Sequence, residues 1–353
     1  MKRRLSRVIK IGSVKIGGNN PVAIQSMAKV KNSDIRRVIP QILCLENSGC
    51  EIIRVAVKDL DDARAISRIK QDISIPLVAD IHFDYRLALA AIAAGADKIR
   101  LNPGNIFKSS QIEQVVDAAR DAGIPIRVGL NSGSVRGAGD PVKLMVAAAL
   151  SYVRQVERYK FHNIVLSLKA NDAAGTIAAY RAIASRCDYP LHLGVTATGL
   201  PFEGMIKSCV ALGSLLTDGI GDTIRISLTD KPQEEIRAAK ALLASLGLRN
   251  FGPSIISCPT CGRCEVDLVR IVKDLEKKMA AGVQPARSGK PLTVAVMGCV
   301  VNGPGEARHA DIGVAFGKNS GLLFKKGKPV RKVGVDTSVR TLLREMRALE
   351  RRR

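Results

Sequence analysis

The chain has no tryptophan, and aromatic residues make up only 3% of its 353 residues. Proteins that bind single-stranded nucleic acid stack bases on aromatic side chains, so this scarcity argues against that class. Long apolar runs are also missing: none approaches the roughly 20 residues that span a bilayer, and no apolar signal core follows the basic start. We therefore expect a cytoplasmic protein with no membrane partner.

Acidic residues are scarce as well. Thirty-two Asp and Glu face 55 Lys and Arg, which gives a formal net charge of +23. Much of the excess lies at the two ends, in Lys2, Arg3, Arg4 and Arg7 and in the segment 318–353. A solvated basic face explains such clusters most simply, while nucleic acid or an acidic protein partner are the alternatives. With so few stacking residues, no specific nucleic-acid partner is expected.

Short β-branched runs alternate with longer helical patterns between residues 20 and 230, which indicates parallel strands joined by crossover helices. No GxGxxG motif follows the first run, so a dinucleotide-binding sheet is disfavoured. Eight units in somewhat over 200 residues are typical of a (β/α)₈ TIM barrel. The eight predicted strands are Val22–Met27, Glu51–Val57, Pro76–His82, Lys98–Asn102, Pro125–Asn131, Asn163–Ala170, Leu191–Thr198 and Thr223–Thr229.

A second, smaller α/β domain is expected after the barrel. A helix over Glu234–Leu246 ends the repeating pattern, and the loop Leu248–Ser257 follows it. We therefore assign residues 1–247 to a substrate-binding barrel and residues 248–353 to the second domain. Its predicted elements are strands at Leu292–Met297 and Asp311–Phe316, a hairpin near Gly321–Val330 and a basic helix over Ser338–Arg352.

Polar residues recur two positions apart near the carboxyl ends of the barrel strands. Alternate strand residues point into a barrel, and these ends face the active site. Several cations at one mouth would repel one another unless an anion lies among them, and guanidinium groups fit phosphoryl oxygens. The pattern predicts a site for a phosphate or diphosphate ester, although a single Arg of this kind is usually a surface ion pair and Asp80 with His82 could be structural. The residues are Arg54, Asp80, His82, Arg100, Asn102, Arg127, Asn131, Ser167, Lys169, Arg225 and Ser227.

Cysteines mark the second domain as a candidate metal centre. Cys258 and Cys261 have CxxC spacing, and Cys299 and Glu306 bracket a turn rich in Gly and Pro. A sulfur-rich donor set suits zinc or an iron–sulfur cluster, and we favour the cluster. Cys264 extends the first motif to CxxCxxC, so a four-cysteine zinc site remains an alternative. Neither the bacterial ferredoxin run nor the CxxxCxxC spacing is present.

If Glu306 is the fourth ligand of a four-iron cluster, one iron is held by an exchangeable carboxylate and can take a substrate oxygen. An anion-holding barrel with an electron-delivering cluster then predicts reductive cleavage of a C–O bond in a phosphorylated substrate. The competing hypothesis is a phosphate-ligand or nucleic-acid-binding protein with a structural zinc module.

Five motifs in order closely resemble the 4-hydroxy-3-methylbut-2-enyl diphosphate synthase family of the non-mevalonate isoprenoid pathway. They are VADIHFDYRLAL, IRLNPGNI, GIGDTIRISL, SCPTCGR and GCVVNGPGEA. The resemblance implies a barrel followed by a reductase-like [4Fe–4S] domain, and a homodimer whose chains pair head to tail. It also implies that 2-C-methyl-D-erythritol 2,4-cyclodiphosphate is converted to the linear allylic diphosphate with two electrons from flavodoxin or ferredoxin.

The resemblance assigns roles to residues of this chain by motif. Cys258, Cys261, Cys299 and Glu306 would bind the cluster, and Glu306, Asp80 and His82 would be catalytic. The substrate would be bound by Arg54, Arg100, Asn102, Arg127, Asn131, Ser167, Lys169 and Asn302.

Two positions depart from the family pattern. Ala197 stands in the seventh strand where an acid is expected, so the proton donor is not identified by resemblance. Cys264 falls outside the four-ligand pattern, and as a nearby thiol it would make the site more prone to oxidation.

Overall fold

The computed structural model describes residues 2–135, 137–196, 198–282, 291–300 and 307–351. The chain divides into two compact units, Met1–Arg249 and Asn250–Arg353. None of the described helices is long and apolar enough to cross a membrane. The roles assigned to the two predicted domains, 1–247 and 248–353, remain predictions.

The first unit is a parallel eight-stranded barrel, as the sequence predicts. Its strands pair in the order β8-β7-β6-β5-β4-β3-β10-β9. A parallel bridge between Leu166 in β8 and Leu191, next to β9, brings the ends of this order together. The strands are β3 Ala23–Met27, β4 Ile52–Val57, β5 Leu77–Ile81, β6 Lys98–Leu101, β7 Ile126–Asn131, β8 Ile164–Lys169, β9 His192–Leu193 and β10 Thr223–Ile224.

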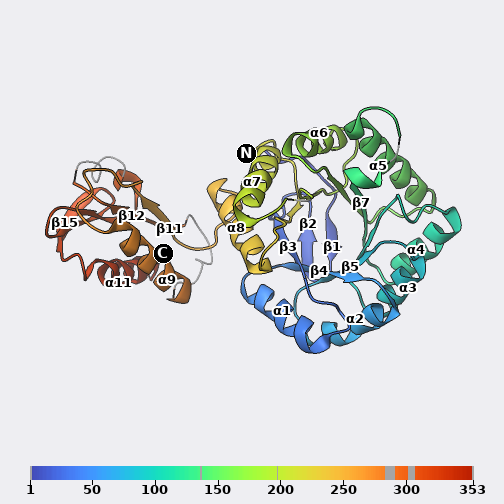
Figure 1. The fold of residues 1–353 in the computed structure, drawn as a ribbon, viewed down its shortest axis with the longest axis horizontal. Helices are drawn as coiled ribbons and strands as arrows, with labels where there is room; N and C mark the ends of the chain where they lie inside the picture. Colours follow the sequence, from blue (N-terminus) through green and yellow to red (C-terminus); the bar gives the residue numbers. More distant parts are fainter. Residues whose placement is uncertain (1, 136, 197, 283–290, 301–306, 352–353) are drawn as a thin grey trace. The chain divides into compact units, whose positions relative to one another are not determined.

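Eight helices form a ring around the strands (Figure 1). Four of them begin at an aspartate whose side chain accepts a hydrogen bond from a first-turn N–H: Asp59, Asp84, Asp140 and Asp172. Such N-caps set the residue at which each helix begins and therefore the length of the loop between a strand and the next helix. The helices are α1 Ile35–Asn47, α2 Leu60–Asp72, α3 Tyr85–Ala93, α4 Ser109–Asp121, α5 Pro141–Arg158, α6 Ala173–Ala184, α7 Pro201–Thr217 and α8 Pro232–Ser245.

A short antiparallel hairpin, β1 Ile9–Ile11 with β2 Val14–Ile16, packs at the amino-terminal end of the barrel. Ile11 and Ile16 are fully buried and form one apolar cluster with strand residues Ala23, Ile52, Val78 and Val165. Burying each isoleucine stabilises the fold by about 1.5–3 kcal/mol. The hairpin therefore gives the barrel an apolar floor, at the end opposite the cavity. The sequence analysis did not predict this hairpin.

The last two barrel strands are much shorter than predicted. The predictions Leu191–Thr198 and Thr223–Thr229 were wrong in length, because regular pairing covers only two residues in each. Beyond these residues the backbone lines a cavity, through Val195, Thr196, Arg225 and Ser227.

The second unit is a five-stranded mixed sheet with helices on one face. The strand order is β11-β12-β13-β14-β15, in which β11, β12 and β13 are parallel and β14 and β15 are antiparallel to their neighbours. One face packs against both helices in a single core. The elements are β11 Ser254–Ser257, α9 Leu268–Gly282, β12 Thr293–Met297, β13 Ile312–Phe316, β14 Gly321–Lys325, β15 Lys328–Val333 and α11 Ser338–Glu350.

One sequence prediction in this unit was wrong. The stretch Leu248–Ser257 was expected to be a loop, but Ser254–Ser257 forms β11 at the edge of the sheet. This strand is mostly exposed and its Ser-Ile-Ile-Ser sequence has no apolar alternation. Its structure comes from backbone pairing with β12, which a hydrophobic pattern does not reveal.

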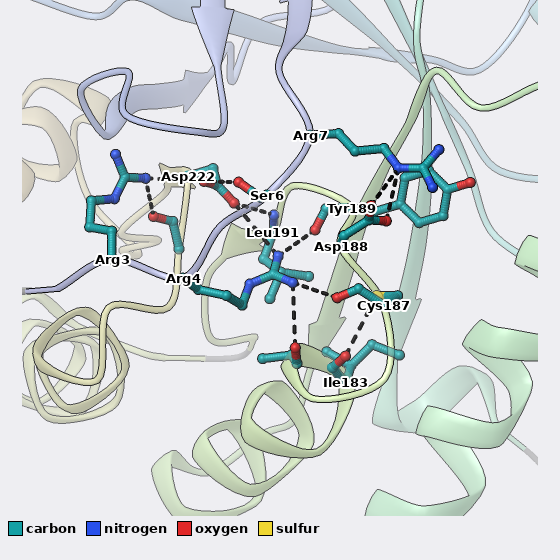
Figure 2. Close-up of polar contacts among 12 residues, drawn as sticks. Arg3, Arg4, Ser6, Arg7, Ile183, Cys187, Asp188, Tyr189, Leu191 and Asp222 are labelled. Carbon is teal, nitrogen blue, oxygen red and sulfur yellow. Dashed lines mark hydrogen bonds and ion pairs between the residues drawn. The ribbon is translucent and has the colours of Figure 1, made fainter.

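The basic amino-terminal segment forms a clasp on the barrel (Figure 2). Arg4 donates from its guanidinium to the carbonyl oxygens of Cys187, at 2.6 Å, and Tyr189, just before β9. Arg3 and Ser6 donate to the buried Asp222, just before β10, at 3.0 and 2.8 Å. Arg3 and Arg4 are therefore structural residues, which removes them from the basic surface that the sequence suggested.

The clasp predicts that Arg4→Met destabilises the protein. The carbonyl groups of Ala184, Cys187 and Tyr189 then lose a charged donor, and we expect the free energy of unfolding to fall by about 1–3 kcal/mol in urea denaturation. The control is Arg68→Met on α2, which removes an exposed ion pair to Asp72. Because exposed pairs contribute little, its loss should be clearly smaller, and equal losses would contradict the structural role of Arg4.

Candidate active site

A cavity of about 220 Å³ lies at the carboxyl ends of the barrel strands. Cavities that enclose drug-sized ligands are roughly 300–1,000 Å³, so this one suits a smaller molecule. Its polar character comes from strands on all sides of the barrel. The lining residues are Arg54, Arg100, Arg127, Asn131, Ser167, Lys169, Val195, Thr196, Arg225 and Ser227.

Asp80 organises one side of the site. The carboxylate accepts hydrogen bonds from Arg54 and from Arg100, at 2.5 and 3.2 Å, and its Oδ2 lies 3.1 Å from His82 Nε2. Burial alone would raise the pKa of Asp80, but Arg54, His82 and Arg100 hold it well below its usual value. Asp80 is therefore ionised, and it orients two cations and an imidazole at the cavity.

Glu235 is a second buried carboxylate, which the sequence analysis missed. It lies on α8, 3.4 Å from Arg225 Nε and 3.1 Å from Lys29 Nζ, and it accepts a hydrogen bond from Ser26. Burial is the first cause that lowers the pKa of Arg225, and Glu235 opposes that shift. In the sequence Glu235 looks like an ordinary first-turn acid of a surface helix, so no signal marked it.

Arg127 and Lys169 lack a direct ion pair among the described residues, although Asp80 acts on Arg127 from a longer distance. Within the described chain, no carboxylate lies at ion-pair distance from either cation, and two guanidinium nitrogens of Arg127 have no hydrogen-bond partner. Burial, followed by Arg127 and Arg225, lowers the pKa of Lys169 well below its ordinary value. Two desolvated cations without anions are unfavourable, so the cavity is built to receive negative charge.

A glycine makes room for Lys169. A Cβ at Gly194, beyond β9, would lie 2.6 Å from Lys169 Nζ. A side chain at position 194 would displace the amine of Lys169, so the position of this amine favours glycine there.

Deeper in the barrel lies another polar layer. Lys98 at the start of β6 and His192 in β9 are fully buried, and Lys98 Nζ and His192 Nε2 have no described partner. Burial and then Arg127 lower the pKa of both groups. Neither residue lines the cavity, and their lowered pKa values favour the neutral forms, so this layer lies below the site without contacting a ligand.

The predicted barrel residues fall into two groups. Arg54, Arg100, Arg127, Asn131, Ser167 and Lys169 line the cavity, and Asp80 and His82 bond to lining residues. Asn102 is different: it does not line the cavity, and its side-chain oxygen accepts from Gly104 N–H at 3.2 Å to stabilise a turn.

Arg225 and Ser227 line the cavity as the strand pattern suggested, although the motif resemblance had not assigned them a role. Thr196 and Val195 were missed because no polar alternation singles them out.

The cysteines of the second unit follow adjacent parallel strands. Cys258 comes directly after β11, and the buried Cys299 lies two residues after β12. The two segments touch, because Gly298 N–H donates to Cys258 Sγ at 3.3 Å. Such N–H donors are typical around metal-bound thiolates, and soft sulfur donors suit an iron–sulfur cluster. Cys261 is exposed in the connecting turn.

Cys264 is a packing residue in this arrangement. Its Sγ donates to the Val266 carbonyl oxygen at 3.2 Å and packs against the core of the unit. A Cβ at Gly298 would lie 2.4 Å from that sulfur, so Gly298 allows the close approach. The thiol of Cys264 thus has a backbone partner and an apolar environment, and its exclusion from the ligand set remains a prediction.

The complete ligand set is not visible in the described structure. Among residues 2–135, 137–196, 198–282, 291–300 and 307–351, no three His, Cys, Asp or Glu side chains lie close enough together to hold a metal ion. Glu306, the predicted fourth ligand, lies outside the described residues, as do Asn302 and Ala197. The donor chemistry and the position of Cys258 and Cys299 fit a cluster, and the ligand assignment remains a prediction.

The fold and site define a class: an α/β protein whose parallel barrel receives an anion and whose second sheet domain presents cysteines at its strand ends. Comparison with known proteins makes this specific. Residues 6–240 match the GcpE TIM-barrel domain model, and residues 254–348 match the GcpE protein C-terminal domain model. The chain belongs to the GcpE family.

Curated relatives cover nearly the whole chain. The chain is 50% identical over 351 residues to a protein of Caldicellulosiruptor saccharolyticus, covering 98% of this chain and 99% of the relative. It is 47% identical to a Fusobacterium nucleatum protein and 49% to a Bacillus subtilis protein, each over 98% of this chain and over 97% and 91% of the relatives. All three are named 4-hydroxy-3-methylbut-2-en-1-yl diphosphate synthase (flavodoxin).

Two solved structures have a similar fold over about two thirds of the chain. Dihydropteroate synthases from Stenotrophomonas maltophilia and Xanthomonas albilineans superpose with TM-scores of 0.54 and 0.53 at 16% and 14% identity. They cover 69% and 68% of this chain and 100% and 99% of their own. At such low identity the likeness confirms the barrel fold and nothing about chemistry.

The buried cations without carboxylate partners should lower the stability of the ligand-free protein and raise its affinity for anions. Lys169→Met removes a buried charge without an acidic partner, so the free energy of unfolding of the ligand-free protein should rise by about 1–3 kcal/mol. The same change removes a phosphoryl contact, so the affinity for inorganic pyrophosphate should fall about tenfold or more. Urea denaturation and isothermal titration calorimetry measure the two effects.

Lys98→Met is the matched control, because Lys98 is also a buried lysine but does not line the cavity. It should also gain stability while losing far less affinity for pyrophosphate. Equal affinity losses in the two variants would mean that Lys169 acts only through long-range potential.

The lowered pKa of Lys169 predicts proton uptake on anion binding. Because the folded pKa lies below the unfolded value of 10.5, the unfolded chain holds the extra proton between the two values, and anion-free stability rises with pH across that window. A bound anion offsets the repulsion and raises the folded pKa. Calorimetric titration with sulfate, in buffers of different ionisation enthalpy near pH 8, should show proton uptake that Lys169→Met largely removes. No uptake in the parent protein would contradict the assignment.

Proposed function

We propose that this protein catalyses the reductive opening of 2-C-methyl-D-erythritol 2,4-cyclodiphosphate to (E)-4-hydroxy-3-methylbut-2-enyl diphosphate, the isoprenoid-pathway reaction that its relatives' names describe. The observation that carries the proposal is a barrel cavity containing two cations without carboxylate partners, in a chain of the GcpE family. A ligand with two phosphoryl groups supplies the missing negative charge. The size of the cavity suits a small phosphorylated polyol.

The barrel residues bind and orient the substrate. Arg127 and Lys169 would contact phosphoryl oxygens, and Ser167 and Asn131 would donate further hydrogen bonds. Arg54 and Arg100 are fixed by Asp80, so they contact the ligand without reorganising, which is the condition for strong electrostatic stabilisation.

The Asp80–His82 pair would handle a proton. The conversion consumes two electrons and two protons and releases water, so a proton must reach the departing oxygen. His82 is partly exposed at the cavity, with its Nε2 between Asp80 and Arg100. Because Nε2 lies within hydrogen-bond distance of both side chains, we assign proton transfer to this pair, a role that needs no acid at position 197.

Cys258, Cys261, Cys299 and Glu306 would hold a [4Fe–4S] cluster. When bound, the cluster supplies the two electrons and a Lewis-acidic iron whose carboxylate ligand can be exchanged. Flavodoxin or ferredoxin would deliver the electrons. The cytoplasmic location and the homodimer implied by the motif resemblance stay predictions.

Metal analysis tests this proposal directly. Anaerobically purified protein should be brown, contain about four iron per chain and convert the cyclic diphosphate with a chemical reductant. Cys261→Ser should lose the cluster, whereas Cys264→Ser should keep both the colour and the activity, because Cys264 is a packing residue. Zinc without iron in the parent protein would refute the proposal, and a colourless Cys264→Ser protein would refute the ligand assignment.

A further inference from the structure

The helix α11 presents a line of arginines on its outer surface. Arg340, Arg344, Arg347 and Arg351 follow one another at intervals of four, three and four residues, which places them along one side of the helix. All four are exposed, and together with Leu343 and Ala348 they line a groove. The opposite side of α11, with Val339, Leu342 and Met346, is buried in the core of the second unit.

This arrangement opposes the stability of the helix. Like charges four residues apart on a helix repel, and Arg340 and Arg344 as well as Arg347 and Arg351 form such pairs. Arg340 also lies in the first turn, where the helix dipole disfavours a positive charge. Arg347, in the last turn, is favoured by the dipole, but helix formation does not explain Arg340 or the repulsion within the two pairs.

Acidic side chains do not neutralise the line. Glu345 pairs with Lys325 at 2.7 Å and lies 3.7 Å from Arg344 and 3.8 Å from Arg331. In the part of the chain that the structure describes, no carboxylate lies within ion-pair distance of Arg340, Arg347 or Arg351. The segment 318–353 has twelve Lys and Arg but only three Asp and Glu. The surface is thus strongly positive over the whole helix.

The line of arginines begins at the same end of the second unit's sheet as the predicted cluster ligand Cys299. Since β12 and β13 are parallel and β14 and β15 are each antiparallel to the strand before, β15 runs in the same direction as β12. The carboxyl ends of β12 and β15 therefore lie at the same end of the sheet. Cys299 follows β12 at this end, and α11 begins there after β15, with Arg340 in its first turn.

We infer that the line Arg340, Arg344, Arg347 and Arg351 is a docking surface for an acidic protein, namely the electron donor of the proposed reaction. The inference rests on the proposed function for the identity of the donor, and on charge complementarity for the surface itself. A membrane is disfavoured because helices that bind bilayers insert an apolar face, and that of α11 is already buried. Single-stranded nucleic acid is disfavoured because α11 has no aromatic residue for base stacking, and duplex DNA is an alternative that the test below distinguishes.

The test compares two double charge reversals in the full-length, cluster-containing protein. Arg340→Glu/Arg347→Glu alters the line of arginines and leaves the ion pair of Arg344 intact. The control, Arg36→Glu/Arg154→Glu, makes the same change in net charge at two exposed arginines on barrel helices α1 and α5. Flavodoxin binding is measured by calorimetry at low and moderate salt, and turnover is measured with flavodoxin and with reduced methyl viologen.

The expected result is a loss of flavodoxin affinity of tenfold or more and a weaker salt dependence in the α11 variant, with the control unchanged. Turnover with methyl viologen should be equal in all three proteins. The inference is overturned if the α11 variant binds flavodoxin as tightly as the parent, or if it loses only binding to anionic vesicles or to DNA. A parent that binds flavodoxin through the helix but is inactive even with methyl viologen would count against the proposed function alone.

Discussion

The structure of the barrel depends on an electrostatic imbalance at its centre. Asp80 and Glu235 compensate some of the cations at the cavity, but Arg127 and Lys169 remain buried without a carboxylate. A folded protein tolerates such charges only if apolar packing elsewhere offsets their cost, and the hairpin at Ile9–Ile16 closing the barrel floor provides part of it. An anion bound among these cations would offset their mutual repulsion, which is the physical basis of the proposed substrate binding.

Both units position their chemistry in the same way. In the barrel, charged side chains gather where parallel strands end, and in the second unit Cys258 and Cys299 follow two adjacent parallel strands at one edge. Parallel pairing brings residues that are far apart in sequence to neighbouring positions without any long-range sequence signal. The close contact at Gly298 shows how small residues complete this arrangement, because any side chain there would displace Cys264.

The large positive charge of the chain has more than one structural origin. Arg3 and Arg4 form the clasp: they donate hydrogen bonds to Asp222 and to carbonyl groups just before β9. Their charges therefore stabilise the fold and are not directed at a ligand. On α11 the opposite holds, since the arginines share few acidic neighbours and remain exposed. The number of basic residues in the sequence does not distinguish these two groups. Arg3 and Arg4 are partly buried against their partners, whereas the arginines of α11 are exposed.

The sequence by itself determined the barrel, the candidate anion-binding residues and the position of the cysteines, because strand periodicity and motif spacing are local properties of the chain. It could not reveal Glu235, which sits in a helix and acquires its role only when α8 packs against Arg225 and Lys29. Nor could it reveal β11, whose exposed residues carry no apolar pattern and whose structure comes from pairing with β12. Tertiary structure alone decided which cations are compensated, because compensation depends on distances between side chains that the order of residues does not specify.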